Sequence, residues 1–186
     1  MAYLFCPQTL HEIAKHRAGL PQEQMTELVI GDLAKAYPGH IETRQNWLFS
    51  MAAGAVGVMT ILHGSLSEYV LLFGTPVGTE GFSGRYHLDI YDFLLAGEMW
   101  TYTEESFRER VITRPGEMAH LRRRQVKGFR VREDTWMLEY GRGCVPTALP
   151  VALGDAVFSA MDIRTIFKTI WGYGRLVVRE LVRGKI

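Results

Sequence analysis

The chain has 186 residues, 47% of them hydrophobic and 22% charged, which is enough for one substantial core and too little for two separate domains. A formal net charge of +1 gives no general attraction for nucleic acid, so we expect no nucleic-acid partner. The two cysteines are too few for a disulfide scaffold and lack the spacing of a metal site. The N-terminus has no basic segment followed by an apolar one, so no secretion signal is expected. Together these features predict a reducing, cytoplasmic location.

Two amphipathic helices are expected at the start of the chain, over residues 8–18 and 21–36. In the second of them, Met25, Val29 and Leu33 recur at helical spacing. Pro21 suits a first helical turn, and Pro38-Gly39 ends the pattern. The chain is therefore predicted to begin with helices.

The central part of the chain has the pattern of strands. Short runs rich in Val, Ile, Tyr, Phe and Trp are separated by clusters of glycine and proline, such as Gly74-Thr75-Pro76. Such a series is typical of a β-sandwich or a β-barrel. We divide the single α+β domain into N-terminal helices (1–46), a β-barrel (47–147) and C-terminal helices (148–186).

Helical periodicity returns over residues 151–160 and 163–182, with Asp162 as an N-cap of the last helix. In that helix, apolar residues such as Phe167 lie among basic residues such as Lys168. The composition fits a helix that lies in a membrane interface and also one that packs its apolar stripe on the barrel. No segment approaches the roughly 20 apolar residues that a spanning helix needs, so no transmembrane helix is expected.

Three carboxylates, Glu68, Asp92 and Glu139, lie inside runs that otherwise resemble buried strands. Period-two alternation places Asp92 on the same face as Ile90 and Leu94, so it should point inward. The strand that carries Glu139 is apolar on both faces and leaves no obvious solvent side. Asp92 and Glu139 are therefore predicted to be buried.

A carboxyl group in an apolar site has a raised pKa, and two carboxyl groups close together cannot both ionise. One of them then keeps a proton and can act as an acid while its neighbour acts as a base. The alternative is that one or more of these acids pair with a buried arginine, such as Arg85 or Arg142, and only stabilise the fold. The residue pattern alone leaves both interpretations open.

Other motifs are weaker. Six scattered histidines, including His63 and His87, lack the paired spacing of a metal site. Asp89 and Asp92 would point to opposite faces of a strand, which argues against a magnesium site. The glycine clusters lack the context of a nucleotide-binding loop. We therefore predict no metal and no cofactor.

Four motifs in order carry a family resemblance. They are the segment His63-Gly-Ser-Leu-Ser-Glu-Tyr-Val-Leu-Leu-Phe-Gly-Thr75, the segment Ser83-Gly-Arg-Tyr86, the segment Trp136-Met-Leu-Glu-Tyr-Gly-Arg-Gly143, and the segment Asp155-Ala-Val-Phe-Ser159. The sequence resembles the family of the fungal sterol C-8 isomerase and the sigma-1 receptor along nearly its whole length. The resemblance is weakest between Thr101 and Asp134.

The resemblance implies a cupin-like β-barrel whose mouth is covered by two C-terminal amphipathic helices. These helices would lie on a membrane, so the resemblance also implies a peripheral membrane protein. It also implies a homotrimer. Members of the family usually begin with a transmembrane helix, which this sequence lacks. Tryptophans of the sigma-1 receptor barrel correspond here to Ala55 and Val131, which predicts a differently shaped ligand.

In the family, an acid pair inside the barrel corresponds to Asp92 and Glu139, which the resemblance makes the catalytic residues, while Glu68 matches a structural acid near a subunit interface. The isomerase protonates a ring alkene, forms a carbocation and removes a different proton. The resemblance further implies a ligand pocket lined by Met59, Tyr69, Leu71, Phe73, Ile90, Leu149 and Tyr173.

Three functions follow for a hydrophobic small molecule in this pocket. The first is an acid–base isomerase of sterols or related polycyclic isoprenoids. The second is a terpenoid cyclase that is initiated by protonation of an alkene. The third is a binder of hydrophobic amines without enzymatic activity, because the sigma-1 receptor resembles the isomerase at both acids without its activity.

Overall fold

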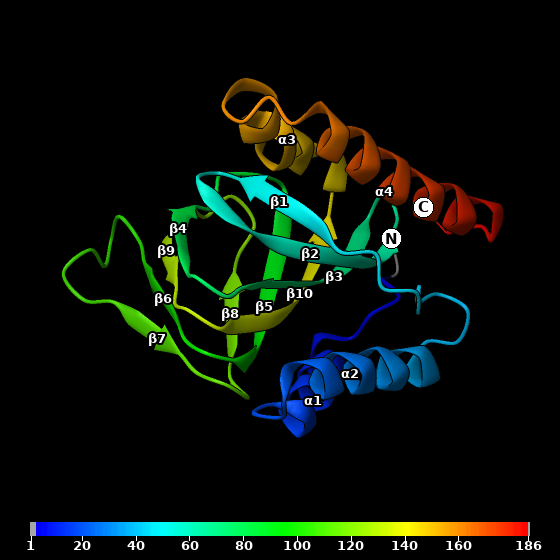
Figure 1. Cartoon of the computed structure of the whole chain (residues 1–186), viewed down its shortest axis with the longest axis horizontal. Coiled ribbons are helices and arrows are strands. Elements are labelled where there is room, and N and C mark those ends of the chain that lie inside the picture. The colour runs from blue at the N-terminus through cyan, green and yellow to red at the C-terminus, as the bar shows by residue number, and fades with distance from the viewer. Residues whose placement is uncertain (1–2, 186) are drawn as a thin grey trace.

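The computed structural model describes residues 3–185, and within them four α-helices accompany two antiparallel sheets (Figure 1). The helices are α1 (Pro7–Arg17), α2 (Gln22–Ala36), α3 (Leu149–Phe158) and α4 (Ile163–Val182), and a short 3-10 helix spans Val145–Ala148. The strands are β1 (Leu48–Ala52), β2 (Ala55–Gly64), β3 (Glu68–Thr75), β4 (Thr79–Phe82), β5 (Leu88–Ala96), β6 (Met99–Tyr102), β7 (Val111–Thr113), β8 (Met118–Leu121), β9 (Gly128–Val131) and β10 (Thr135–Gly143). The predicted α+β class is confirmed.

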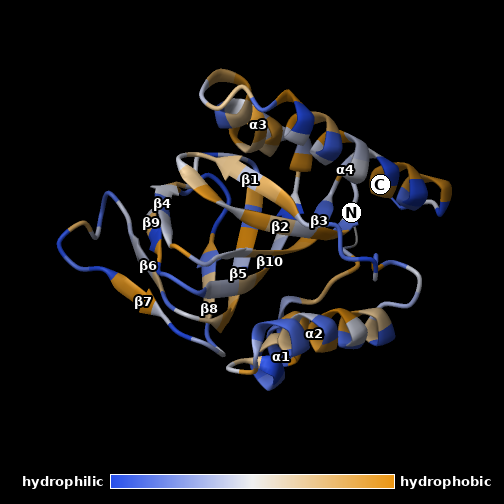
Figure 2. Ribbon diagram, viewed as in Figure 1, coloured by the Kyte–Doolittle hydropathy of each residue, from blue (hydrophilic) through white to orange (hydrophobic). Residues whose placement is uncertain are grey.

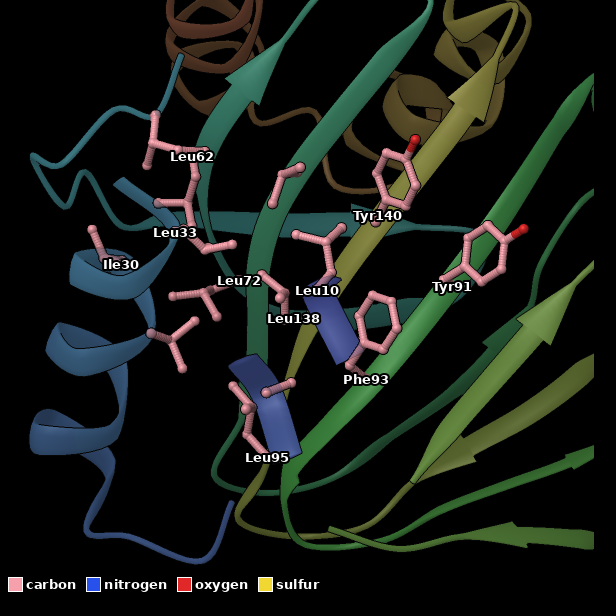
Figure 3. Packing of buried hydrophobic residues seen from close by; sticks show 14 of the residues in the cluster. Leu10, Ile30, Leu33, Leu62, Leu72, Tyr91, Phe93, Leu95, Leu138 and Tyr140 are labelled. Atoms are coloured by element: carbon pink, nitrogen blue, oxygen red, sulfur yellow. The ribbon is translucent and has the colours of Figure 1, made fainter. Parts of the chain in front are cut away.

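The larger sheet has the strand order β1-β2-β3-β10-β5-β8, with β10 between β3 and β5. Its outer face packs on α1 and α2 and forms the main core (Figure 3). Leu72, Phe93 and Leu138 of the sheet meet Leu10 of α1 and Leu33 of α2 there, and all five side chains are buried. Because side chains alternate along a strand, the residues next to these, Leu71, Asp92 and Glu139, point to the inner face.

The smaller sheet has the order β4-β9-β6-β7 and covers the inner face of the larger one. The β-region, predicted as a cupin-like β-barrel, is not closed by strand pairing: among residues 3–185, no strand ladder joins the two sheets. At the free edge of the larger sheet, β1 packs against α3, which covers an edge that a closed barrel would have paired. The β-region is therefore two facing sheets that enclose a space between them.

The C-terminal helices lie on the side of the β-region opposite to α1 and α2 (Figure 1). Asp162 is the N-cap of α4, and its side chain accepts a hydrogen bond from the backbone N–H of Thr165 at 3.0 Å, as predicted. Pro150 stands in the first turn of α3, where its missing N–H has no helical partner to lose. Among the described residues, no helix is both long and apolar enough to cross a membrane.

Glu68 connects the two ends of the chain to the larger sheet. Its buried carboxylate accepts hydrogen bonds from the backbone N–H groups of Leu4 and Phe5, at 2.8 and 3.1 Å, and from the hydroxyl of Tyr140 at 2.7 Å. It also forms an ion pair with Lys185. A buried charge with this many partners stabilises the fold, and its contacts lie away from the inner face of the sheet.

Candidate active site

A cavity of about 470 Å³ lies between the two sheets, beneath α3 and α4. Its wall is mostly apolar, and α3 and α4 contribute residues such as Leu153 and Ile170. The cavity is lined by all seven residues that the resemblance assigns to a pocket, namely Met59, Tyr69, Leu71, Phe73, Ile90, Leu149 and Tyr173. Ala55 and Val131, which stand at the tryptophan positions of the sigma-1 receptor, line it as well.

Asp92 and Glu139 both line this cavity and lie directly opposite each other on β5 and β10. Directly opposed residues on antiparallel strands have Cβ atoms about 4.5–5.5 Å apart and side chains on the same face. The alternation that predicted an inward Asp92 is therefore correct, and the strand register adds Glu139 to the same wall.

Glu139 is the acid that this environment keeps protonated. Burial, and next the charge of Asp92, raise the pKa of Glu139 to about 7. The hydroxyl of Tyr69 donates a hydrogen bond to Oε1 of Glu139 at 2.6 Å, and this bond and the charge of Lys127 oppose the rise. At neutral pH, Glu139 can therefore exist in both protonation states, which is the condition for general acid catalysis.

Asp92 is paired with a cation. Oδ2 of Asp92 lies 2.5 Å from Nζ of Lys127, and the two side chains are 6% and 11% exposed. The alternative interpretation of the sequence named Arg85 or Arg142 as the partner, and that is wrong. Arg142 donates to the hydroxyl of Tyr91, and Arg85 pairs with the exposed Glu104.

Sequence reasoning missed Lys127, although one signal was available. Lys127, Phe129 and Val131 alternate along β9 and the residue before it, and all three line the cavity. A lysine in the same alternation as two inward apolar residues is expected to point inward too. Lys127 also lies in the stretch where the family resemblance is weakest, so no motif drew attention to it.

Two tyrosines complete the polar part of the wall. Burial, and next the Glu139 carboxylate, raise the pKa of Tyr69 well above its usual value. Burial, followed by the charges of Glu139 and Asp92, also raises the pKa of Tyr86. Both phenols therefore keep their protons at neutral pH and can act as hydrogen-bond donors.

The remaining titratable groups singled out in the sequence lie elsewhere. Asp89 is on the opposite face of β5 from Asp92, as predicted, and pairs with His120 at 3.4 Å. His63 is buried beside the carbonyl oxygen of His40, and burial lowers the pKa of His63 to about 4, so the ring is neutral. Within residues 3–185, no group of three or more His, Cys, Asp or Glu side chains is arranged to hold a metal ion.

The fold and site define an α+β protein that encloses an apolar cavity with two opposed carboxyl groups on its wall. A family model described as ERG2 and Sigma1 receptor like protein matches residues 1–185. The chain belongs to this family, and the resemblance found in its motifs is confirmed.

Several curated relatives match nearly the whole chain. "Protein erg2 homolog" of Dictyostelium discoideum is 38% identical over 95% of this chain and 76% of that protein. "Sigma non-opioid intracellular receptor 1" of Gallus gallus is 39% identical over 96% of this chain and 81% of the receptor. "C-8 sterol isomerase erg2" of Aspergillus fumigatus is 34% identical over 98% of this chain and 78% of the isomerase. The family thus contains proteins named as enzymes and proteins named as receptors.

Solved structures with a distant likeness cover about half of the chain. A cupin superfamily protein from Desulfitobacterium hafniense is 20% identical with a TM-score of 0.40, over 55% of this chain and 83% of that one. KdgF from Halomonas sp. is 13% identical with a TM-score of 0.43, over 56% of this chain and 91% of that one. Likeness at this level carries no information about the site.

The raised pKa of Glu139 predicts a pH-dependent stability. Between about pH 4.5 and 7, the folded protein holds a proton on Glu139 that the unfolded chain has released, so the free energy of unfolding falls as pH rises through this window. Glu139→Gln cannot ionise and escapes this loss. From pH 5 to pH 8 we expect the variant to gain about 1–3 kcal/mol relative to the parent protein in chemical denaturation.

The matched control is Glu133→Gln, an exposed glutamate in the turn before β10. Its stability should follow that of the parent protein at every pH. If Glu139→Gln also follows the parent protein from pH 5 to pH 8, Glu139 does not hold a proton in this window.

Proposed function

We propose that the protein is an acid–base isomerase that shifts a double bond in a sterol or a related polycyclic isoprenoid. The observation that carries this proposal is the placement of Asp92 opposite Glu139 on the wall of an apolar cavity of about 470 Å³. Membership of a family that contains proteins named C-8 sterol isomerase supports the substrate class.

The chemistry needs an acid, a base and a dry site. One carboxyl group of the pair gives a proton to an alkene carbon, which leaves a tertiary carbocation on its neighbour. The other carboxylate removes a proton from an adjacent carbon, and the electrons of that C–H bond form the new double bond. Apolar walls keep out the water that would trap the cation as an alcohol, and the negative charge left on the pair stabilises it.

Two alternatives use the same cavity. Ala55 and Val131 leave room where bulkier side chains would reduce it, which suits a cyclase that protonates an alkene of a flexible terpenoid. A receptor-like binder of hydrophobic amines would need a carboxylate free to pair with the ligand. Lys127 already supplies Asp92 with an ammonium group, so Glu139 is the carboxyl group of the pair that a ligand amine would contact.

The apolar face of α4 supports a proposal about location. Phe167, Trp171 and Val178 are 70%, 78% and 60% exposed, although α4 already packs on the rest of the protein through the buried Leu176 and lines the cavity through Tyr173. Figure 2 shows hydrophilic and hydrophobic residues interspersed along α4, and Lys168 is one of its exposed basic residues. We propose that this face lies on an anionic membrane surface, from which a lipid-soluble substrate can enter. The trimer implied by the resemblance stays a prediction.

Deuterium incorporation tests the reaction. The protein is incubated in deuterated water with a sterol that has a ring double bond at carbon 8, and the product is analysed by mass spectrometry and NMR. An isomerase that protonates the alkene leaves deuterium at the protonated carbon. Glu139→Gln and Asp92→Asn should each lower the rate by a factor of about 10²–10⁴, because each removes one partner of the proton transfer.

The matched control is Asp89→Asn, which removes a carboxylate from the opposite face of the same strand and should keep the parent rate. Full activity in both Glu139→Gln and Asp92→Asn would contradict the assignment of the pair. Deuterated product with a new ring, in place of a shifted double bond, would identify the cyclase.

Sedimentation with liposomes tests the membrane proposal. The protein should pellet with anionic vesicles at low salt and detach at high salt, because each basic residue near the surface contributes about 1 kcal/mol that salt screens. Phe167→Ser combined with Trp171→Ser should abolish binding. Phe107, in the loop between β6 and β7, is 67% exposed, and Phe107→Ser should leave vesicle binding unchanged. Equal binding of vesicles by both variants would contradict the proposal that this face of α4 contacts the membrane.

A further inference from the structure

Lys127 is a cation that the fold places inside the apolar cavity. It precedes β9 and lines the cavity, with Nζ 2.5 Å from Oδ2 of Asp92. Both of its backbone groups are fixed by Ser83: the N–H of Lys127 donates to Oγ of Ser83 at 2.9 Å, and its carbonyl oxygen accepts from the N–H of Ser83 at 2.9 Å. Ser83 therefore fixes the backbone of Lys127, and Asp92 binds its ammonium group.

A lysine in such a place is costly to the fold. Removing an ammonium group from water costs several kcal/mol, and one carboxylate partner recovers this only when the geometry is good. An apolar side chain at position 127 would extend the apolar wall formed by Phe129 and Val131. The charge of Lys127 thus has a use other than packing.

The ion pair makes the two carboxyl groups unequal. Asp92 is in contact with a full positive charge, whereas Glu139 receives a neutral hydroxyl donor from Tyr69 at 2.6 Å. A contacting cation favours an ionised carboxylate more strongly than a neutral donor does. Without Lys127, the hydrogen bond from Tyr69 would be the remaining difference between the partners that residues 3–185 give the two groups, and it favours an ionised Glu139 with the shared proton on Asp92.

We propose that Lys127 fixes the direction of proton transfer, so that Glu139 is the acid and Asp92 is the base. Lys127 is a positioning residue in this arrangement, because it acts on the ligand through Asp92. The proposal rests on the proposed function for the chemistry that follows, and the position of the resting proton can be measured without any substrate.

The hydrogen bond from Tyr69 ends on Oε1 of Glu139, and within the described chain Oε2 has no partner. The O–H bond at Oε2 breaks as the new C–H bond of the ligand forms, which leaves a Glu139 carboxylate. Oδ1 of Asp92 then accepts the proton from the adjacent carbon. Afterwards the ammonium of Lys127 favours return of this proton to Glu139, which restores the starting state without a further reactant.

The same charges indicate the class of ligand. In the resting state, the charges of Lys127 and Asp92 cancel and protonated Glu139 is neutral. Within residues 3–185, the other titratable side chains that line the cavity are Tyr69, Tyr86 and Tyr173, which are also neutral. The cavity is therefore adapted to an uncharged alkene, and a negative charge at Glu139 arises only when the ligand becomes a cation.

Isotope-edited infrared spectroscopy locates the proton. At pH 6, exposed carboxyl groups are ionised, and a protonated carboxyl group gives a separate C=O band. We expect this band to shift when glutamate is labelled with ¹³C at the side-chain carboxyl, to stay unchanged when aspartate is labelled, and to disappear in Glu139→Gln. A band that shifts with the aspartate label, or the absence of any such band, would overturn the proposal.

Two variants separate the charge of Lys127 from its packing. In Lys127→Met, Asp92 loses its cation, and the band should become sensitive to the aspartate label. Lys127→Arg keeps the charge and should restore the parent pattern. A Lys127→Met variant that keeps the glutamate-only pattern would overturn the role of Lys127, and the labelled parent protein alone still tests the position of the proton if that variant does not fold.

The result is separable from the proposed function. A glutamate-only band without deuterium incorporation into any isoprenoid would contradict the isomerase and leave the charge arrangement intact. Deuterium incorporation with an aspartate-sensitive band would contradict the assignment of acid and base and leave the isomerase intact.

Discussion

The site depends on one electrostatic constraint: two carboxyl groups stand opposite each other on the apolar wall of a cavity. Burial makes ionisation of each group unfavourable without a partner, and the charge of one makes ionisation of the other less favourable. The structure meets this constraint unequally, with the ammonium of Lys127 on Asp92 and the phenol of Tyr69 on Glu139. Burial and the charge of Asp92 raise the pKa of Glu139, and the direction proposed for proton transfer follows from the unequal partners of the two carboxyl groups.

The two carboxyl groups stand on the cavity wall because the two faces of the larger sheet have different neighbours. β10 lies at the centre of the larger sheet, and its alternation sends Leu138 and Tyr140 into the core against the N-terminal segment while Glu139 points into the cavity. Glu68, at the end of β3 next to β10, uses its charge to hold the chain ends. Glu68 and Glu139 thus stand on neighbouring strands but on opposite faces of the sheet, and only Glu139 lines the cavity.

Much of this could be predicted from the sequence, because it depends on local patterns. Periodicity predicted the helices to within about a residue or two at each end, and alternation predicted that Asp92 points inward. The contact between Lys127 and Asp92 could not be found in this way, since it joins residues 35 apart through the placement of a second sheet. The sequence also has no local signal for the packing of α3 against β1, so it could not show that the two sheets of the cupin-like region stay separate.

Glu139 is the proposed source of the proton that starts the reaction, and the pH dependence of kcat/KM for sterol isomerisation tests this role most directly. For the free enzyme, kcat/KM should be high at pH 6 and fall tenfold per pH unit above about 7, where Glu139 loses its proton. A kcat/KM that stays constant or rises between pH 7 and pH 9 would contradict the account.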